Sequence, residues 1–356
     1  MTEFDFLTKT IKKSLPKIYI GSLLKYSYLP LLYPNLGHKK KSTILFAEDV
    51  FRYISEPFVE IVDIPAIADY FLIPHNYFIV RKEFDYLENF FSLAKQHQKK
   101  VIVFAYGDSS EEINLENAII IRTSRYRSEL KANELIMPAY SDDLLFDNNI
   151  QLRIKTNHPV ICFCGWAGFT DFWRWLKFKI KDFPYHFRFD KFRRQGLFFR
   201  RQCLKVLTYS SLIKSNFIIR NNYSGYKTTI RLSPERAREE YINNLINCDF
   251  ALVVKGDGNF SYRFYEALSL GRIPLLLDTE CVLPLDDIIN YNDFTLMVNY
   301  HQINKIDKIV ANFYNSLSEE KFQQMQQSAR SVFANYLRID KFFSHLFKEI
   351  YKLNND

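Results

Sequence analysis

The segment 249–278 constrains the fold more than any other part of the chain, because it joins two apolar runs through a glycine-containing turn and a short helical stretch. The runs 249–254 and 273–277 are apolar enough to be buried parallel strands. Gly256 and Gly258 follow the first run, and glycine lets a backbone turn sharply and bring its N–H groups close to a ligand. The pattern predicts a strand, a glycine loop, a helix and a second strand.

The predicted helix begins at Ser261, a residue type that commonly caps helices, and ends before Gly271, where a C-terminal glycine belongs. A helix start at the carboxyl end of a parallel strand is an anion site, because its free N–H groups and its dipole attract negative charge. Arg263 and Glu266 are three residues apart and share one helix face. We expect Arg263 to meet a phosphate and Glu266 to accept hydrogen bonds from ribose hydroxyls, which together describe a pocket for a nucleotide diphosphate.

This segment resembles the donor-binding core of the exostosin family of glycosyltransferases. The family pattern is a glycine loop, Ser-x-Arg, two or three residues, Glu-Ala, a short gap, Gly-x-Ile-Pro, an apolar strand and Leu-Pro. The matching residues are Gly256, Gly258, Ser261, Arg263, Glu266, Ala267, Gly271, Ile273, Pro274, Leu283 and Pro284. Similar residues at 68–74, 101–108 and 159–168 extend the resemblance over roughly 45–300. The chain departs from the family at Arg272, where the family usually has a cysteine.

The resemblance implies a GT-B type fold, with two Rossmann-like α/β domains that face a cleft and C-terminal helices that cross back to the first domain. It implies inverting transfer of a sugar from a nucleotide-diphosphate sugar, UDP-linked, to a hydroxyl of a glycan, polysaccharide or lipid-linked acceptor. A helix start and an arginine can stabilise the departing diphosphate, so we expect neither a metal nor a cofactor. The acidic pairs 142–143 and 286–287 lack the Asp-x-Asp spacing of metal-dependent glycosyltransferases.

Apolar strand-like runs alternate with helical stretches along the chain, which is typical of parallel α/β sheets. The runs are 42–47, 70–73, 101–105, 118–121, 160–163, 217–219, 250–254, 273–277 and 294–298. They are too many for one ordinary sheet, so two Rossmann-like halves fit better. We predict an acceptor-side domain at 1–155, a nucleotide-sugar-binding domain at 156–325 and C-terminal helices at 326–356. The ends should be helical, with a short helix at 5–15 and two helices within 319–351.

A catalytic base should come from the first domain, at the carboxyl end of a strand. His75 follows the run at 70–73, and its unperturbed pKa of about 6.5 suits proton transfer. Asp108 follows the run at 101–105, and Glu48 with Asp49 follows the run at 42–47. The sequence leaves these candidates open.

Three further residues are candidates for the donor side. Lys255 comes directly after the strand of the glycine loop, and Arg220 follows the run at 217–219, so either side chain could reach the diphosphate. Gly165 belongs to a predicted loop after the run at 160–163, and that loop could cover the donor phosphates.

The net charge is +8, and much of it lies between Trp173 and Lys205, where aromatic residues interleave with basic ones. The basic residues are Arg174, Lys177, Lys179, Lys181, Arg188, Lys191, Arg193, Arg194, Arg200, Arg201 and Lys205. Such a stretch could contact an anionic membrane or an anionic glycan, or it could be a solvated helix face. Nucleic acid is disfavoured, because no recognised nucleic-acid module accompanies the charge.

No signal peptide and no apolar run of about 18 residues is evident, so we expect a cytoplasmic protein, with peripheral attachment to the inner face of a membrane as an alternative. The resemblance then points to a soluble branch of the family, of the kind found in bacteria or large viruses. Two other functions stay open: a non-catalytic nucleotide-sugar- or glycan-binding partner of a glycan polymerase, and a basic module that binds membranes or nucleic acid.

Overall fold

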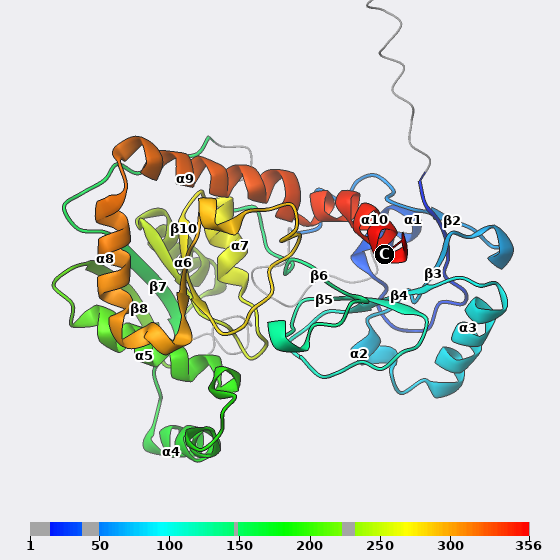
Figure 1. Cartoon of the computed structure of the whole chain (residues 1–356), viewed down its shortest axis with the longest axis horizontal. Coiled ribbons are helices and arrows are strands. Elements are labelled where there is room, and N and C mark those ends of the chain that lie inside the picture. The colour runs from blue at the N-terminus through cyan, green and yellow to red at the C-terminus, as the bar shows by residue number, and fades with distance from the viewer. Residues whose placement is uncertain (1–14, 38–49, 146–148, 223–231, 356) are drawn as a thin grey trace, which may run out of the picture.

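The computed structural model describes residues 15–37, 50–145, 149–222 and 232–355. They form two α/β units, each built around a parallel sheet (Figure 1). The first sheet has the strand order β2-β1-β3-β4-β5-β6, and the second has the order β11-β10-β9-β7-β8. Every strand pairing named within these sheets is parallel. The predicted fold class, with two Rossmann-like α/β halves, is confirmed.

The strands of the first sheet are β1 (Lys17–Tyr19), β2 (Glu60–Ile61), β3 (Tyr70–Leu72), β4 (Val101–Ala105), β5 (Ala118–Arg122) and β6 (Glu134–Ile136). Those of the second are β7 (Val160–Trp166), β8 (Lys214–Arg220), β9 (Phe250–Val253), β10 (Ile273–Asp278) and β11 (Leu296–Asn299). All of the predicted runs except 42–47 coincide with one of these strands, and 42–47 lies outside the described residues. β4 and β9 are buried along their whole length, as expected for strands covered on both faces.

The helices are α1 (Tyr33–Leu36), α2 (Tyr77–Val80), α3 (Phe84–Gln96), α4 (Phe172–Asp182), α5 (Gly196–Thr208), α6 (Pro234–Ile246), α7 (Tyr262–Ser269), α8 (Ile306–Ser316), α9 (Glu319–Val332) and α10 (Ile339–Asn355). In the described ranges, none of them combines the length and the apolar character that crossing a bilayer requires. The helix expected at 5–15 begins outside those ranges.

The C-terminal helices connect the two units. α9 packs against α7 and β10 of the second unit and continues through a π-helical turn, Phe333–Leu337, into α10. α10 lies on the first unit, where the Phe343 ring is 5.5 Å from Phe58 and 6.4 Å from Phe104 (Figure 1). The expected return of the C-terminal helices to the first domain is confirmed.

The two units also meet where their strands end. The backbone of Tyr126, shortly after β5, forms an antiparallel bridge with Cys281, shortly after β10. Arg127 donates to the carbonyl of Cys281 at 2.9 Å and to the carboxylate of Asp278 at 3.2 Å. The carboxyl ends of the two parallel sheets therefore face each other, which is the position where open α/β sheets bind ligands.

Candidate active site

The strand, glycine loop, helix and strand predicted at 249–278 are present as β9, α7 and β10. Ser261 occupies the N-cap position of α7, as predicted. Its side chain, however, makes no capping hydrogen bond. Gly271 has φ of +64° and ends the helix, because its N–H and that of Arg272 bond to the carbonyls of Leu268 and Ala267. This strand-loop-helix-strand segment brings the start of α7 to the carboxyl end of β9.

Arg263 lies across the carboxyl ends of β7 and β9. Its Nη2 donates to the carbonyl of Cys164 at 2.5 Å, and its guanidinium lies 4.3 Å from the centre of the Phe163 ring. Its Nε is buried and has no hydrogen-bond partner among the described residues. Gly165 makes this position possible, because a Cβ there would lie 2.9 Å from Arg263 Nη2. The prediction of a loop at Gly165 was wrong: the residue is inside β7, and its lack of a side chain admits the arginine.

Glu266 is enclosed by α6. Its side chain accepts from Arg238 Nη1 at 2.7 Å and from the Tyr241 hydroxyl at 2.5 Å, and the residue is 3% exposed. Burial first, and then the charge of Glu266, raise the pKa of Tyr241 well above its usual range, so Tyr241 stays a donor. Each oxygen thus accepts one hydrogen bond from a protein group, and the role of Glu266 as a ribose ligand stays a prediction.

Lys255 follows β9 and is buried. Its Nζ donates to the carbonyl of Phe192 at 2.7 Å and to the Tyr126 hydroxyl at 3.1 Å. Burial first, and then the nearby charge of Arg193, lower the pKa of Lys255 to about 7. A lysine in this state changes charge near neutral pH, which makes it a candidate for binding or proton transfer.

The glycine loop touches the first unit. Gly256 N–H bonds to the carbonyl of Phe260 at 2.9 Å, and Gly258 N–H bonds to Asp108 Oδ1 at 3.3 Å. Asn259 fastens the loop, because its amide nitrogen donates to the carbonyls of Arg125 and Glu280 at 3.1 and 3.0 Å. In this closed arrangement the N–H groups of both glycines are bonded to protein atoms rather than open to an anion.

Asp108 is the first-unit candidate that meets the donor-side loop. Burial, reinforced by the charge of Asp257, raises the pKa of its carboxyl group. His75 is fully buried, and its two ring nitrogens lie 3.0 Å from the backbone N–H of Leu24 and the carbonyl of Ser27. Nε2 therefore accepts and Nδ1 donates, which fixes a neutral ring inside the first unit. Glu48 and Asp49 lie outside the described residues.

Other cations stand at the ends of the same strands. Arg220, at the end of β8, donates to the carbonyl of Ala237 at 3.2 Å and pairs with Glu240 at 3.5 Å. Arg200 of α5 donates to the carbonyl of Lys255 at 2.9 Å and to that of Trp166 at 3.4 Å. Sequence reasoning assigned Arg200 to the basic stretch and did not identify its contacts with these backbone carbonyls. The available signal was its position one turn after Gly196, the first residue of α5.

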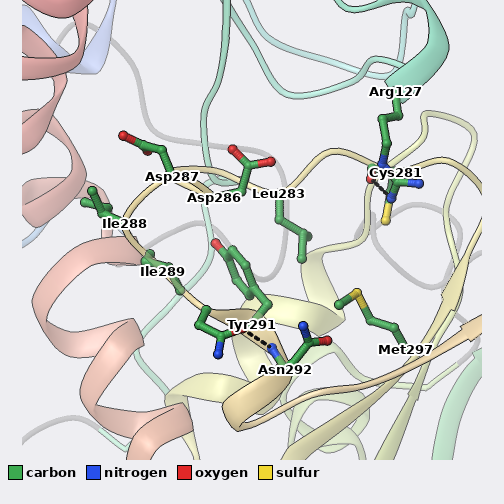
Figure 2. A pocket seen from close by; sticks show the side chains of 11 residues that line it. Arg127, Cys281, Leu283, Asp286, Asp287, Ile288, Ile289, Tyr291, Asn292 and Met297 are labelled. Atoms are coloured by element: carbon green, nitrogen blue, oxygen red, sulfur yellow. Dashed lines mark hydrogen bonds between the residues drawn. The ribbon is translucent and has the colours of Figure 1, made fainter.

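A cavity of about 380 Å³ opens beside this region, after the carboxyl end of β10 and next to the start of β11 (Figure 2). The segment 281–292 forms most of it, and Met297 and Arg127 complete the wall. Burial first, and then the charge of Asp287, raise the pKa of Asp286, which Figure 2 shows between Leu283 and Asp287. The volume is within the range of about 300–1,000 Å³ that is usual for small-molecule sites. Sequence reasoning did not identify this cavity, because only the turn after β10 brings its residues together.

No three His, Cys, Asp or Glu side chains gather at a metal-binding distance in the part of the chain that the structure describes. The donor-side candidates and Asp108 therefore form a site of buried cations, strand-end carbonyls and one first-unit carboxyl group.

Residues 189–313 match the model of the exostosin GT47 domain. The chain is 30% identical over 123 residues to the exostosin-1 homolog of Caenorhabditis elegans, covering 34% of this chain and 31% of that protein. It is 29% identical over 102 residues to exostosin-1 of Drosophila melanogaster, covering 29% of this chain and 13% of that protein. The matched region is thus less than a third of the length of either relative.

Among solved structures, a mutant of S. aureus TarM in complex with Fondaparinux, alpha-GlcNAc-glycerol and UDP has a TM-score of 0.35 and 9% identity, covering 80% of this chain and 55% of that one. This likeness is too weak to carry an argument. The family match contains Arg200, Arg220, Lys255, Arg263, Glu266 and, apart from Arg127, the residues that line the cavity after β10. Over residues 189–313 the chain therefore matches the exostosin GT47 family, which confirms the resemblance predicted from its sequence.

Proposed function

We propose that the chain is a glycosyltransferase that moves a sugar from a nucleotide-diphosphate sugar, UDP-linked, to a hydroxyl of a glycan, polysaccharide or lipid-linked acceptor. One observation carries the proposal: within the exostosin GT47 match, Arg263, Arg200 and Lys255 gather at the carboxyl ends of parallel strands, and the glycine loop beside them meets Asp108 of the first unit. Cations on one side and a carboxyl group on the other suit transfer with a diphosphate leaving group.

In the proposed reaction, the carboxylate of Asp108 takes the proton of the acceptor hydroxyl. The hydroxyl oxygen attacks the anomeric carbon from the face opposite the diphosphate, and the bond from that carbon to the diphosphate oxygen breaks. Arg263 and Arg200 stabilise the charge that grows on the leaving diphosphate. The buried Nε of Arg263, which lacks a partner within the part of the chain that the structure describes, supports this role, because an unsatisfied buried donor gains most from an added acceptor.

The cavity after β10 is the proposed place for the nucleoside or the sugar. It offers carboxylates and amides for hydroxyl groups at Asp286, Asp287 and Asn292, with the apolar surface of Met297 beside them. Asp287 is also paired with Lys352 of α10 at 2.7 Å, so the C-terminal helix supports this wall.

A thermal-shift panel with UDP, GDP and CMP tests donor binding, because a ligand that binds the folded state raises the melting temperature. We expect UDP to give the largest shift. Turnover is then measured as UDP release from UDP-sugars with an oligosaccharide acceptor. Asp108→Asn should keep the UDP shift and lower turnover by about 10²- to 10⁴-fold. A normal rate in that variant would remove Asp108 as the base.

Asp257→Asn is the matched control. Asp257 is exposed and raises the pKa of Asp108, so its removal should leave the maximal rate intact and move the acidic limb of the pH profile to lower pH. The proposal includes metal-independent transfer, so turnover should survive EDTA. Loss of turnover in EDTA that Mn²⁺ restores would overturn that part.

A non-catalytic partner of a glycan polymerase is the second candidate. It is favoured by one observation: Glu266 and the N–H groups of Gly256 and Gly258 are all bonded within the protein. A protein of this kind would bind a nucleotide or a glycan and show no turnover with any UDP-sugar. The same two assays therefore separate the candidates.

A further inference from the structure

An apolar stripe faces outward on α4 and the turn that follows it. Six large side chains there are between 61% and 102% exposed. They are Phe172, Trp173, Ile180, Phe183, Phe187 and Phe189. Single exposed apolar residues are ordinary, but a contiguous group of this size marks an interaction surface.

The stripe follows from the helical spacing. At about 100° per residue, Phe172, Trp173, Ile180 and Phe183 fall within an arc of roughly 100°. Phe178 points the opposite way, is buried, and its ring lies 5.3 Å from Phe169. α4 therefore attaches to the protein by one face and presents a second apolar face outward.

Basic side chains border the stripe. Residues 171–190 contain five basic residues and three acids. Asp182 is buried and pairs with Arg194 at 3.2 Å, and Asp171 and Asp190 pair with Arg174 and Arg188 at 3.8 and 2.7 Å, so the uncompensated charge is that of the three lysines of α4. Lys177 lies on one side of the stripe by the same spacing and Lys179 on the other. These two and Lys181 are exposed, and none of them has an ion pair among the described residues.

The charges further along the basic stretch have other roles. Arg193 pairs with Glu129, and Arg201 donates to the carbonyl of Ala167 at 2.8 Å. With Arg194 and Arg200 also bonded within the fold, the part of the basic stretch that faces outward is 172–189.

We propose that α4 and the turn through Phe189 dock on an anionic lipid bilayer. Aromatic and aliphatic side chains would enter the interface, while the lysines on both sides reach the lipid phosphates, as in amphipathic interfacial helices. The excess of positive charge around the apolar face fits an anionic lipid surface better than a protein surface. Docking on a protein surface would leave the lysines beside the apolar face without ion-pair partners. Figure 1 shows α4 standing away from both sheets, joined to the second unit by two chain segments, so the bilayer would meet no other element first.

This docking would serve the proposed function, because of where α4 lies relative to the candidate active site. α4 follows β7, whose last residue, Trp166, contacts Arg200, and the chain returns through Phe192, whose carbonyl contacts Lys255. A docked bilayer would therefore lie on the side of the candidate active site, where a lipid-linked acceptor could reach it.

Co-sedimentation with vesicles tests the proposal on the full chain. The probes are phosphatidylcholine vesicles with and without 30% phosphatidylserine, and the protein should bind those with phosphatidylserine. Lys177→Gln, Lys179→Gln and Lys181→Gln together should lower the partition coefficient by about a hundredfold. Binding should also weaken at high salt. A variant with Trp173→Ser, Ile180→Ser and Phe183→Ser should also lose binding to the vesicles with phosphatidylserine.

Two control variants match these changes elsewhere on the surface. Lys95→Gln, Lys308→Gln and Lys348→Gln remove equal charge, and Ile64→Ser, Ile67→Ser and Phe84→Ser remove exposed apolar groups. Equal loss of binding in the control variants, or no binding to anionic vesicles, would overturn the proposal. It would also be overturned if the α4 variants changed only the oligomeric state of the protein in the absence of lipid. The UDP thermal shift of each variant is recorded in parallel. Vesicle binding without a nucleotide shift would contradict the proposed function and leave the docking intact.

Discussion

At the scale of single residues, the hydrogen bonds of Glu266 join α7 to α6. Arg263 and Glu266 do lie on one helix, as their spacing requires. The partners of Glu266 are Arg238 and Tyr241, which are 28 and 25 residues away in the chain. Nothing local predicts that α6 covers this face, so a carboxylate expected in a ligand site is found inside a buried network.

We predict that Glu266→Ala destabilises the fold. The change removes the 2.7 Å partner of Arg238 and the acceptor of the Tyr241 hydroxyl, while Asp142 still pairs with Arg238 at 3.2 Å, and losing a hydrogen bond to a charged group costs about 1.5–3 kcal/mol. Urea unfolding measures the loss. Glu239→Gln, an exposed carboxylate on the same helix as Arg238, should change stability by less than about 0.5 kcal/mol. Equal stability of Glu266→Ala and wild type would show that the network contributes nothing.

Lys255 gives a pH-dependent prediction. Its pKa in the fold is lowered to about 7, whereas an unfolded lysine titrates at about 10.4. Between these values the unfolded state binds more protons, so stability should rise with pH, by at most about 1.4 kcal/mol per unit. Below pH 7 the lysine is charged in both states and adds no slope.

The measurement is urea unfolding between pH 6 and pH 9. Lys255→Met should remove the rise that wild type shows above about pH 7, because no buried ammonium then loses its proton. Lys95→Met, at an exposed lysine, should keep it. Identical slopes in wild type and Lys255→Met would show that Lys255 is not the group responsible.

At the scale of elements, the long buried runs were predictable and the short strands were not. β4, β9 and β10 are continuous apolar runs, so their pattern identifies them directly. β1, β2 and β6 have three, two and three residues, which is too short for a periodic signal. Their strand conformation depends on pairing with neighbours that are distant in sequence.

Arg272, the departure from the family pattern, joins several elements of the second unit. It is 2% exposed, and its guanidinium donates to the carbonyls of Ile246 and Gln151 at 3.1 and 2.9 Å and to Gln326 of α9 at 3.2 Å. This arginine therefore fastens α6, α9 and the connection between the two units around the end of α7.

We predict that Arg272→Ala lowers the free energy of unfolding by about 3–5 kcal/mol, because it leaves a cavity and several unpaired buried acceptors. A double-mutant cycle with Gln326→Ala should give a coupling of about 0.5–3 kcal/mol, since the two side chains are in contact. Arg236→Ala, on the exposed face of α6, is the control and should be nearly neutral. Additive losses at Arg272 and Gln326 would contradict the shared network.

At the scale of the whole molecule, two α/β halves and a returning C-terminal helix followed from element order and from the family resemblance. The contact between the halves did not, because it depends on pairs such as Asn259 with Arg125, which are 134 residues apart. The proposed reaction requires this contact to open so that the donor can enter and then to close around the donor. The fit of the glycine loop against Asp108 therefore sets the balance between the open and the closed state.

Gly258 allows the two halves to come this close. A Cβ at this position would lie 2.8 Å from both Cα and the carbonyl oxygen of Asp108, which are backbone atoms that cannot turn aside. At Gly256 the nearest atom to a Cβ would be 3.7 Å away, an ordinary contact. We therefore predict that Gly258→Ala separates the halves at their contact, whereas Gly256→Ala leaves them closed.

Hydrogen exchange measures the difference. In Gly258→Ala the backbone amides of 106–111 and 122–129 should exchange faster than in wild type, because the bonds from Gly258 to Asp108 and from Asn259 to Ser124 and Arg125 hold these segments closed. Amides of β9 and β10 should keep their protection, since they are bonded within one sheet. Equal exchange in Gly258→Ala and Gly256→Ala would show that the glycine loop does not control closure. Faster exchange throughout β9 and β10 would show instead that the substitution unfolds the second unit, so the outcome separates an opened molecule from a destabilised one.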